Sequence, residues 1–233
     1  MLIFIKLFLA HLIGDFILQS NKWVVDKELN KLKSKYLYFH VIIHFVITML
    51  LLWDWSYWKM ALLIMVSHFS IDALKLYVAP SIKNSRIPFF VDQALHLIVL
   101  YTCAYYGDLF HHTTEIVQQI DLTLVTAFVF VSFPAAIIIS KMLEGMSKHI
   151  EIDHESLPNA GMYIGIIERF FVLTFIILGH WEVIGFLIAA KSVFRFNDLK
   201  ESNSRELTEY ILIGTLLSFG LAILTGIFCI TYA

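Results

Sequence analysis

The amino-acid sequence predicts an all-α membrane protein, a polytopic bundle of about eight transmembrane helices. Of its 233 residues, 59% are hydrophobic and 15% are charged, whereas about a quarter of the residues of a soluble domain are charged. The mean hydropathy is +0.76. The apolar residues also come in runs of about 20, the length that a helix needs to cross a bilayer. A soluble fold of this size has too little interior to bury so many apolar side chains.

Eight apolar runs are candidates for membrane helices, and no soluble domain is visible between them. In chain order, the predicted helices are Leu2–Ser20, Tyr36–Trp53, Trp58–Val78, Pro88–Gly107, Leu122–Met142, Gly161–Gly179, Trp181–Phe196 and Leu207–Tyr232. The first run contains His11 and Asp15 and lacks a small-residue cleavage pattern, so we expect a membrane helix there and not a cleaved signal peptide. The segment Asn21–Lys35 is expected to be a connecting loop.

The basic residues of the connections predict the orientation of the bundle. Lys and Arg follow the first, third, fifth and seventh helices, whereas Lys59 alone follows the second and none follow the fourth and sixth. Cytoplasmic connections carry an excess of Lys and Arg. The alternation therefore predicts that both termini lie on the outer side.

Other features exclude some classes of partner. The formal net charge is −2, so no strongly basic surface indicates binding to nucleic acid. Cys103 and Cys229 lie far apart in apolar runs, which is typical neither of a disulfide framework nor of a thiolate metal site.

Each of the first four predicted helices carries two potential metal ligands spaced four residues apart. This spacing places both side chains on one helical face, with their Cβ atoms about 6 Å apart. In the predicted topology all eight fall at a similar depth in the cytoplasmic half of the membrane. The ligands are His11, Asp15, His40, His44, His68, Asp72, Asp92 and His96. We therefore predict that residues 1–107 form a four-helix bundle around a metal site.

The cost of burying charge favours metal over simple pairing. An ionised Asp at the centre of a membrane helix costs about 2.5–3.5 kcal/mol, and pairing among these residues alone would set three carboxylates against neutral imidazoles. One or two divalent transition metals would offset that charge, and nitrogen and oxygen donors without sulfur suit zinc, manganese or iron. The alternative is that each pair is a polar clamp between helices.

These motifs resemble an uncharacterised bacterial membrane family, domain of unknown function 3307. The resemblance lies in L-A-H-L-I-G-D-F-I-L-Q (Leu9–Gln19), H-x-x-x-H (His40–His44), S-H-F-S-I-D-A-L-K (Ser67–Lys75) and F-V-D-Q-A-L-H (Phe90–His96). It covers roughly Leu2–Tyr106. It implies a multi-pass protein of the bacterial cytoplasmic membrane but brings no activity, so function must be argued from the site.

Residues 108–233 are predicted to form four further membrane helices that pack on the first four and carry a basic cytoplasmic edge. Their charged residues can pair across helices or snorkel, or form a vestibule for an anionic head group. Candidates for contact with a substrate are Lys75, Gln93, Glu168, Arg169, Lys191 and Arg195. Gln93 can also orient metal ligands. Gly161 and Gly165 form a G-x-x-x-G pair that allows a homodimer.

Three functions remain open at this point. The first is a metal-dependent hydrolase that acts from the cytoplasmic side on an amphiphilic or lipid-linked phosphate, in which Asp15, Asp72 or Asp92 is a catalytic base. The second is a transporter of divalent cations or protons, although the outer halves of the first four helices are almost continuously apolar. The third is a scaffold in which the metal is only structural.

Overall fold

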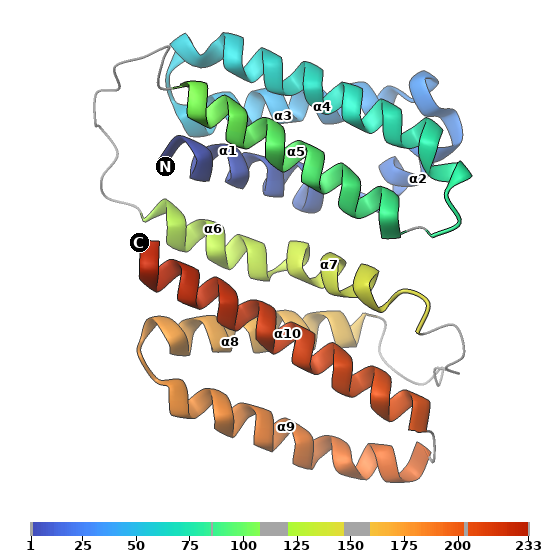
Figure 1. The fold of residues 1–233 in the computed structure, drawn as a ribbon, viewed down its shortest axis with the longest axis vertical. Helices are drawn as coiled ribbons and strands as arrows, with labels where there is room; N and C mark the ends of the chain where they lie inside the picture. Colours follow the sequence, from blue (N-terminus) through green and yellow to red (C-terminus); the bar gives the residue numbers. More distant parts are fainter. Residues whose placement is uncertain (1, 85, 108–120, 147–158, 203–204, 233) are drawn as a thin grey trace. The chain divides into compact units, whose positions relative to one another are not determined.

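The computed structural model describes residues 2–84, 86–107, 121–146, 159–202 and 205–232, with the side chains of 194–202 and 205 left out. All regular structure in these ranges is helical, as the sequence predicts (Figure 1). The chain divides into two compact units, Met1–Leu122 and Thr123–Ala233. Each unit is described by itself, and the packing of the second half on the first remains a prediction.

Six described helices are long and apolar enough to cross a membrane, or seven if one bent pair forms a single span. The six fall on predicted spans two to six and eight. The bent pair joins the first predicted span to the segment after it. The seventh predicted span lies within a helix whose apolar character Glu182 and Lys191 interrupt. The count of eight and the outer placement of both termini therefore remain predictions.

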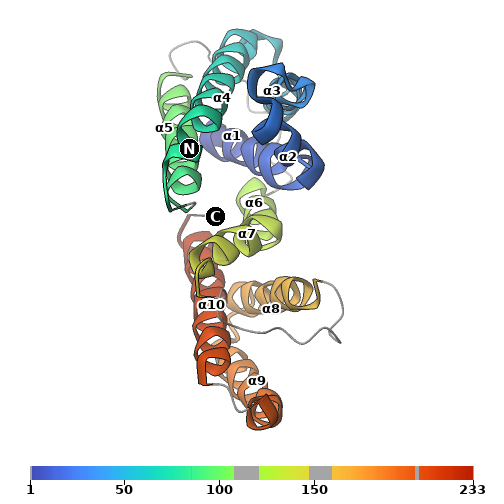
Figure 2. The ribbon, with the colours of Figure 1, turned by 90° about the vertical axis from the view of Figure 1, so that its right-hand side faces the viewer.

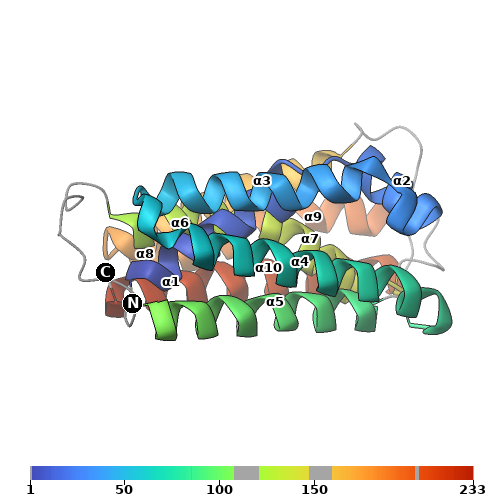
Figure 3. The same cartoon turned by 90° about the horizontal axis from the view of Figure 1, so that it is seen from above.

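Four helices of unit 1 lie side by side, with α1 and α4 each packed against both α3 and α5 (Figures 1 and 3). The short turn η3 (Trp55–Tyr57) joins α3 to α4, and η4 (Ala79–Ser81) follows α4. The four helices are α1 (Leu2–Leu12), α3 (Lys35–Leu52), α4 (Trp58–Val78) and α5 (Arg86–Gly107).

The segment after α1 is helical, and the prediction of a loop over Asn21–Lys35 is wrong. The π-helical turn η1 (Ile13–Ile17) extends α1, and α2 (Asn21–Asn30) with η2 (Lys31–Lys33) then turns by 83°. Ser20, an N-cap residue type, precedes α2, and the helix contains neither Gly nor Pro, which is a local signature of a helix. Figure 3 shows α2 at one end of the four helices, and it packs against α3.

The described part of unit 2 contains five helices, of which α10 packs against α7, α8 and α9. A turn with Gly179 in a left-handed conformation (φ 79°) joins α8 to α9, as is common where helices end in glycine. Figure 2 shows α8 and α9 beside α10. The five are α6 (Leu122–Val131), α7 (Phe133–Leu143), α8 (Ala160–Ile177), α9 (Trp181–Ser202) and α10 (Arg205–Tyr232).

A buried arginine stabilises the break between α6 and α7. Pro134 has no backbone N–H and interrupts the helical ladder near Ser132. Arg169, which is 3% exposed, donates from Nε to the carbonyl oxygen of Val131 at 2.6 Å and from Nη2 to that of Ser132 at 3.1 Å. Its Nη1 donates to Ser218 Oγ at 3.0 Å. Arg169 thus donates to two backbone carbonyls at the break, of which that of Ser132 also accepts from the backbone N–H of Ala136 at 3.3 Å.

We predict that Arg169→Met destabilises unit 2 by about 2–3 kcal/mol, because buried carbonyl oxygens lose their donors. Ser218→Ala removes one of the three bonds and should cost only about 1 kcal/mol. Unfolding in mixed micelles with increasing SDS, followed by far-UV circular dichroism, measures both. If the Arg169→Met protein were as stable as wild type, the guanidinium of Arg169 would not stabilise the break between α6 and α7.

Candidate metal centre

Eight polar side chains from the four helices of unit 1 meet in its interior, and they are the eight that the sequence singled out. The five histidines are between 1% and 3% exposed, and none of the three aspartate side chains exceeds 8%. They form three overlapping groups, in each of which the potential ligand atoms lie within 4.8 Å of one another. The groups are His11, Asp15, His44 and His68; His40, His68 and Asp72; and Asp72, Asp92 and His96.

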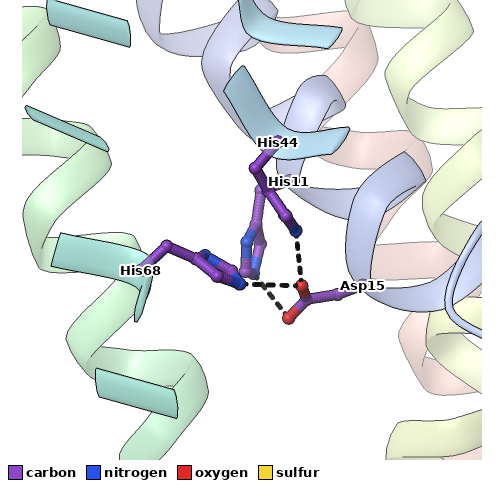
Figure 4. A group of neighbouring side chains, drawn as sticks. All are labelled: His11, Asp15, His44 and His68. Carbon is purple, nitrogen blue, oxygen red and sulfur yellow. Dashed lines mark hydrogen bonds and ion pairs between the residues drawn. The ribbon is translucent and has the colours of Figure 1, made fainter. Parts of the chain in front are cut away.

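Asp15 is the centre of the first group (Figure 4). Its Oδ1 lies 2.9 Å from Nε2 of His44 and 3.3 Å from Nε2 of both His40 and His68. Its Oδ2 lies 3.7 Å from Nε2 of His11. Figure 4 shows the side chains of His11, His44 and His68 converging on this carboxylate from three helices. Four imidazole nitrogens therefore surround one buried carboxylate.

The backbone beside Asp15 makes room for His44. Gly14 and Asp15 lie in the π-helical turn Ile13–Ile17, a feature that often marks functional sites. A Cβ at position 14 would lie 2.5 Å from Cε1 and Nε2 of His44. The ring of His44 also stacks on His68, with centroids 3.8 Å apart. Glycine at position 14 is therefore what lets His44 reach Asp15.

The second group is notable for a close approach of two imidazole nitrogens. Nε2 of His40 and Nε2 of His68 are 3.0 Å apart, and Nε2 of His40 is 3.6 Å from Oδ2 of Asp72. Two nitrogen ligands of one tetrahedral Zn²⁺, with bonds of about 2.0–2.1 Å, lie about 3.3 Å apart. The spacing fits shared coordination, and it also fits a hydrogen bond in which one ring donates and the other accepts.

The third group contains buried polar atoms that lack partners. Within the described part of the chain, neither ring nitrogen of His96 has a hydrogen-bond partner, and the same holds for Oδ1 of Asp92. Nδ1 of His96 lies 3.9 Å from that oxygen. Buried polar atoms are almost always satisfied in native structures. This group therefore has unused capacity to bind a ligand.

Two lysines neutralise two of the three carboxylates. Nζ of Lys27 lies 3.0 Å from Oδ2 of Asp72, and Nζ of Lys75 lies 2.8 Å from Oδ2 of Asp92. The sequence argument counted pairing among the eight residues alone, and the structure adds two ammonium groups to that charge balance. With neutral histidines, three carboxylates and two ammonium groups leave one negative charge, beside Asp15.

Lys27 is the residue that the sequence did not reveal. It is 6% exposed, and it also donates to Oε1 of Gln19. In the sequence it is one of several lysines in a polar segment between two apolar runs, where it indicates cytoplasmic orientation. The helical signature of α2 is readable, but the face of α2 that turns inward depends on the 83° bend.

An apolar cluster closes one side of the site. Leu7, Ile64 and Leu100 lie one turn from His11, His68 and His96 on the same helices, and they pack together with Leu52, Tyr57 and Cys103 in the core of unit 1. The polar groups therefore occupy the end of the bundle that carries α2 and η4, and the other end is packed with apolar side chains.

The structure places the six predicted substrate contacts in different surroundings. Gln93 lies within the site, where Nε2 donates to Oδ2 of Asp15 at 3.2 Å and Oε1 accepts from Nε2 of His11 at 3.2 Å. Lys75 lies at its edge. The others belong to unit 2: Lys191 pairs with Glu168 at 2.5 Å, Arg169 binds backbone oxygens, and the side chain of Arg195 lies outside the described residues.

Comparison with known proteins identifies a family. The family described as "Protein of unknown function (DUF3307)" matches residues 3–125, slightly more than half of the chain, and the match includes all eight converging residues. No curated protein and no solved structure matches the chain. The family description assigns no activity.

We predict that Lys27→Met lowers the free energy of unfolding by about 3–5 kcal/mol, since it leaves the Asp72 carboxylate buried without its cation. Lys22→Met is the matched control, because Lys22 is exposed on the same helix and should change stability by no more than about 0.5 kcal/mol. SDS-induced unfolding followed by tryptophan fluorescence reports mainly on unit 1. Equal stability of the two variants would contradict the buried pair.

We also predict that Gly14→Ala destabilises the protein by about 1–3 kcal/mol, because the new methyl group overlaps the wedged ring of His44. Gly220→Ala is the control, since no atom lies within 4 Å of a Cβ at that helical position. It should be neutral or stabilising by up to about 1 kcal/mol. SDS-induced unfolding followed by far-UV circular dichroism, which reports on the helices of both units, compares the two variants. A neutral Gly14→Ala would mean that the close approach of His44 to η1 does not exist.

Proposed function

This chain belongs to the DUF3307 family, and we propose that it is a metal-dependent membrane hydrolase whose substrate is the phosphate ester of an amphiphile. The observation that carries the proposal is the convergence of five histidines and three aspartates inside one apolar helical bundle. Ionisable residues inside membrane bundles mark functional sites. Helical bundles build metal sites from inward-facing carboxylates and histidines on several helices.

Two cation positions fit the ligand groups. The first would be held by His11, Asp15, His44 and His68, a mixed nitrogen and oxygen set that suits zinc, manganese or iron. The residual negative charge beside Asp15 favours a cation there. The second would be held by Asp72, Asp92 and His96, of which His96 has no hydrogen-bond partner among the described residues. His40 lies between the two positions.

Phosphoester hydrolysis matches this composition. A bound divalent cation lowers the pKa of its water and polarises a phosphoryl oxygen. In the reaction, the water oxygen bonds to phosphorus, the ester oxygen leaves with the bonding electrons, and a proton from the water passes to that oxygen. We assign Oδ1 of Asp92 to the second cation and not to the catalytic base, because His96 beside it shares the lack of a partner.

The one-sided distribution of polarity favours an enzyme over a transporter. Alternating access requires a route from the site to both faces of the membrane. Here the core of Leu7, Leu52, Ile64 and Leu100 lies between the site and one end of the bundle, which leaves access from the other end. Access from one end is sufficient for a hydrolase, whereas a transporter needs a route to both faces. On the orientation expected from the basic loops, the accessible side is the cytoplasmic side of a bacterial inner membrane.

We predict that the purified protein holds one or two equivalents of a transition metal, and that His44→Ala/His96→Ala loses at least one of them. Asp72→Ala and Asp92→Asn should also lose metal, whereas Lys191→Ala, in unit 2, should not. Plasma mass spectrometry on protein in detergent measures the content. With the metal found, release of phosphate from short-chain phosphatidic acid in mixed micelles should fall to background in the double variant.

Three results would change the proposal. A metal-free wild type that stays folded would contradict the metal centre, and the buried histidines would then be a proton relay or polar clamps between helices. Metal that is bound at full stoichiometry without phosphate release would favour a structural role. Unchanged metal content in Asp92→Asn would return that carboxylate to the role of base.

A further inference from the structure

A groove between α4 and α5 leads from the side of unit 1 to the candidate metal centre. Its volume is about 110 Å³, somewhat less than the cavity of about 150 Å³ that is known to bind benzene in another protein. Apart from Lys75 and Asp92, its wall is apolar: Ile71, Leu74, Val78, Ala79, Ile82, Ile87, Pro88, Val91 and Leu95. A short length of hydrocarbon chain fits these dimensions and this lining.

Asp92 connects the groove to the site. It lines the groove and also belongs to the ligand group with Asp72 and His96. Lys75 binds Asp92 through Nζ, and its side chain is 34% exposed. An ammonium group has three donors, and Asp92 is the hydrogen-bond acceptor of Lys75 within the described residues. Lys75 therefore places an ammonium group, paired on one side with Asp92, and its further N–H donors where the apolar wall ends.

The other approach to the site is covered. Lys27 on α2 is buried against Asp72, and η2 packs against both α3 and α4 at that end of the bundle. Toward the opposite end the site is bordered by the apolar core, and the pocket of about 440 Å³ at that end is lined by none of the eight ligand residues. The groove beside Lys75 thus joins the outer surface of α4 and α5 in unit 1 to the polar interior.

We propose that this groove binds the hydrocarbon chain of a membrane phospholipid with a terminal phosphate, of the phosphatidic acid type, and that Lys75 receives the phosphate. This inference rests on the proposed hydrolase, because it supplies the substrate of that site and the lateral path by which the substrate reaches it. The apolar wall selects an amphiphile over a free phosphate ion, and the lysine selects an anionic lipid over a zwitterionic one.

Photo-crosslinking tests the groove directly. The full-length protein is reconstituted in phosphatidylcholine vesicles that contain phosphatidic acid with a diazirine in its acyl chain, and labelled peptides are mapped after irradiation. We expect labels on α4 and α5 along the groove, displaced by unlabelled phosphatidic acid and not by inorganic phosphate. A phosphatidylcholine probe with the same diazirine measures labelling by bulk lipid.

Three variants make the result specific. Val91→Trp fills the groove and should abolish the displaceable label, whereas Ile98→Trp, at an exposed position further along α5, should retain it. Lys75→Gln should reduce the preference for phosphatidic acid over phosphatidylcholine about fivefold, the contribution of one interfacial lysine. Metal content is measured on the same samples and should be unchanged in both tryptophan variants.

The two measurements separate the two proposals. A metal-loaded protein in which Val91→Trp labels like wild type, or in which inorganic phosphate displaces the lipid, overturns the groove and leaves the hydrolase standing. A metal-free protein with groove labelling that depends on Val91 and Lys75 overturns the hydrolase and establishes a binding site for anionic lipid.

Discussion

The burial of three carboxylates inside an apolar bundle is the constraint on which unit 1 depends. A charged group out of water must be compensated at close range, and here each aspartate has its own compensation. Lys75 lies one turn from Asp72 on α4 and reaches across to Asp92. Lys27 arrives from α2. Asp15 receives imidazoles from three helices and the amide of Gln93. The bend after η1 therefore contributes to charge compensation, because it brings Lys27 to the buried carboxylate of Asp72.

Helical periodicity in the sequence is enough to predict which residues of the site share a helical face. Residues four apart share a face, so His40 with His44 and Asp92 with His96 could be paired without a structure. Burial of these pairs follows from the cost of exposing them to lipid. The partners of the carboxylates could not be read in the same way. Lys75 was visible as the next turn after Asp72, but Lys27 acquires its role only when α2 folds back.

Unit 2 shows the same limit for a different reason. Pro134 explains the helix break between α6 and α7, because proline lacks a backbone donor. Arg169, which donates to the carbonyl of Val131 at the break, comes from α8. It is next to Glu168, which pairs with Lys191. In the sequence, Glu168, Arg169 and Lys191 can be interpreted in two ways: as charges that pair across helices or snorkel, or as a vestibule for an anionic head group. The structure divides them into an ion pair and a buried guanidinium that binds backbone oxygens, and this division depends on tertiary packing that no local pattern encodes.

The unmet hydrogen-bonding capacity of the site is spread over three helices. Within the described residues, Oδ1 of Asp92, both ring nitrogens of His96, and Nδ1 of His11 and of His40 have no hydrogen-bond partner. Three of these five atoms lie on α5, and the groove beside Lys75 reaches Asp92. A bundle built only for stability would satisfy such atoms or replace them with apolar groups. Unused binding capacity where this groove meets buried charge fits the proposal that the ligand is an amphiphile that enters through the groove.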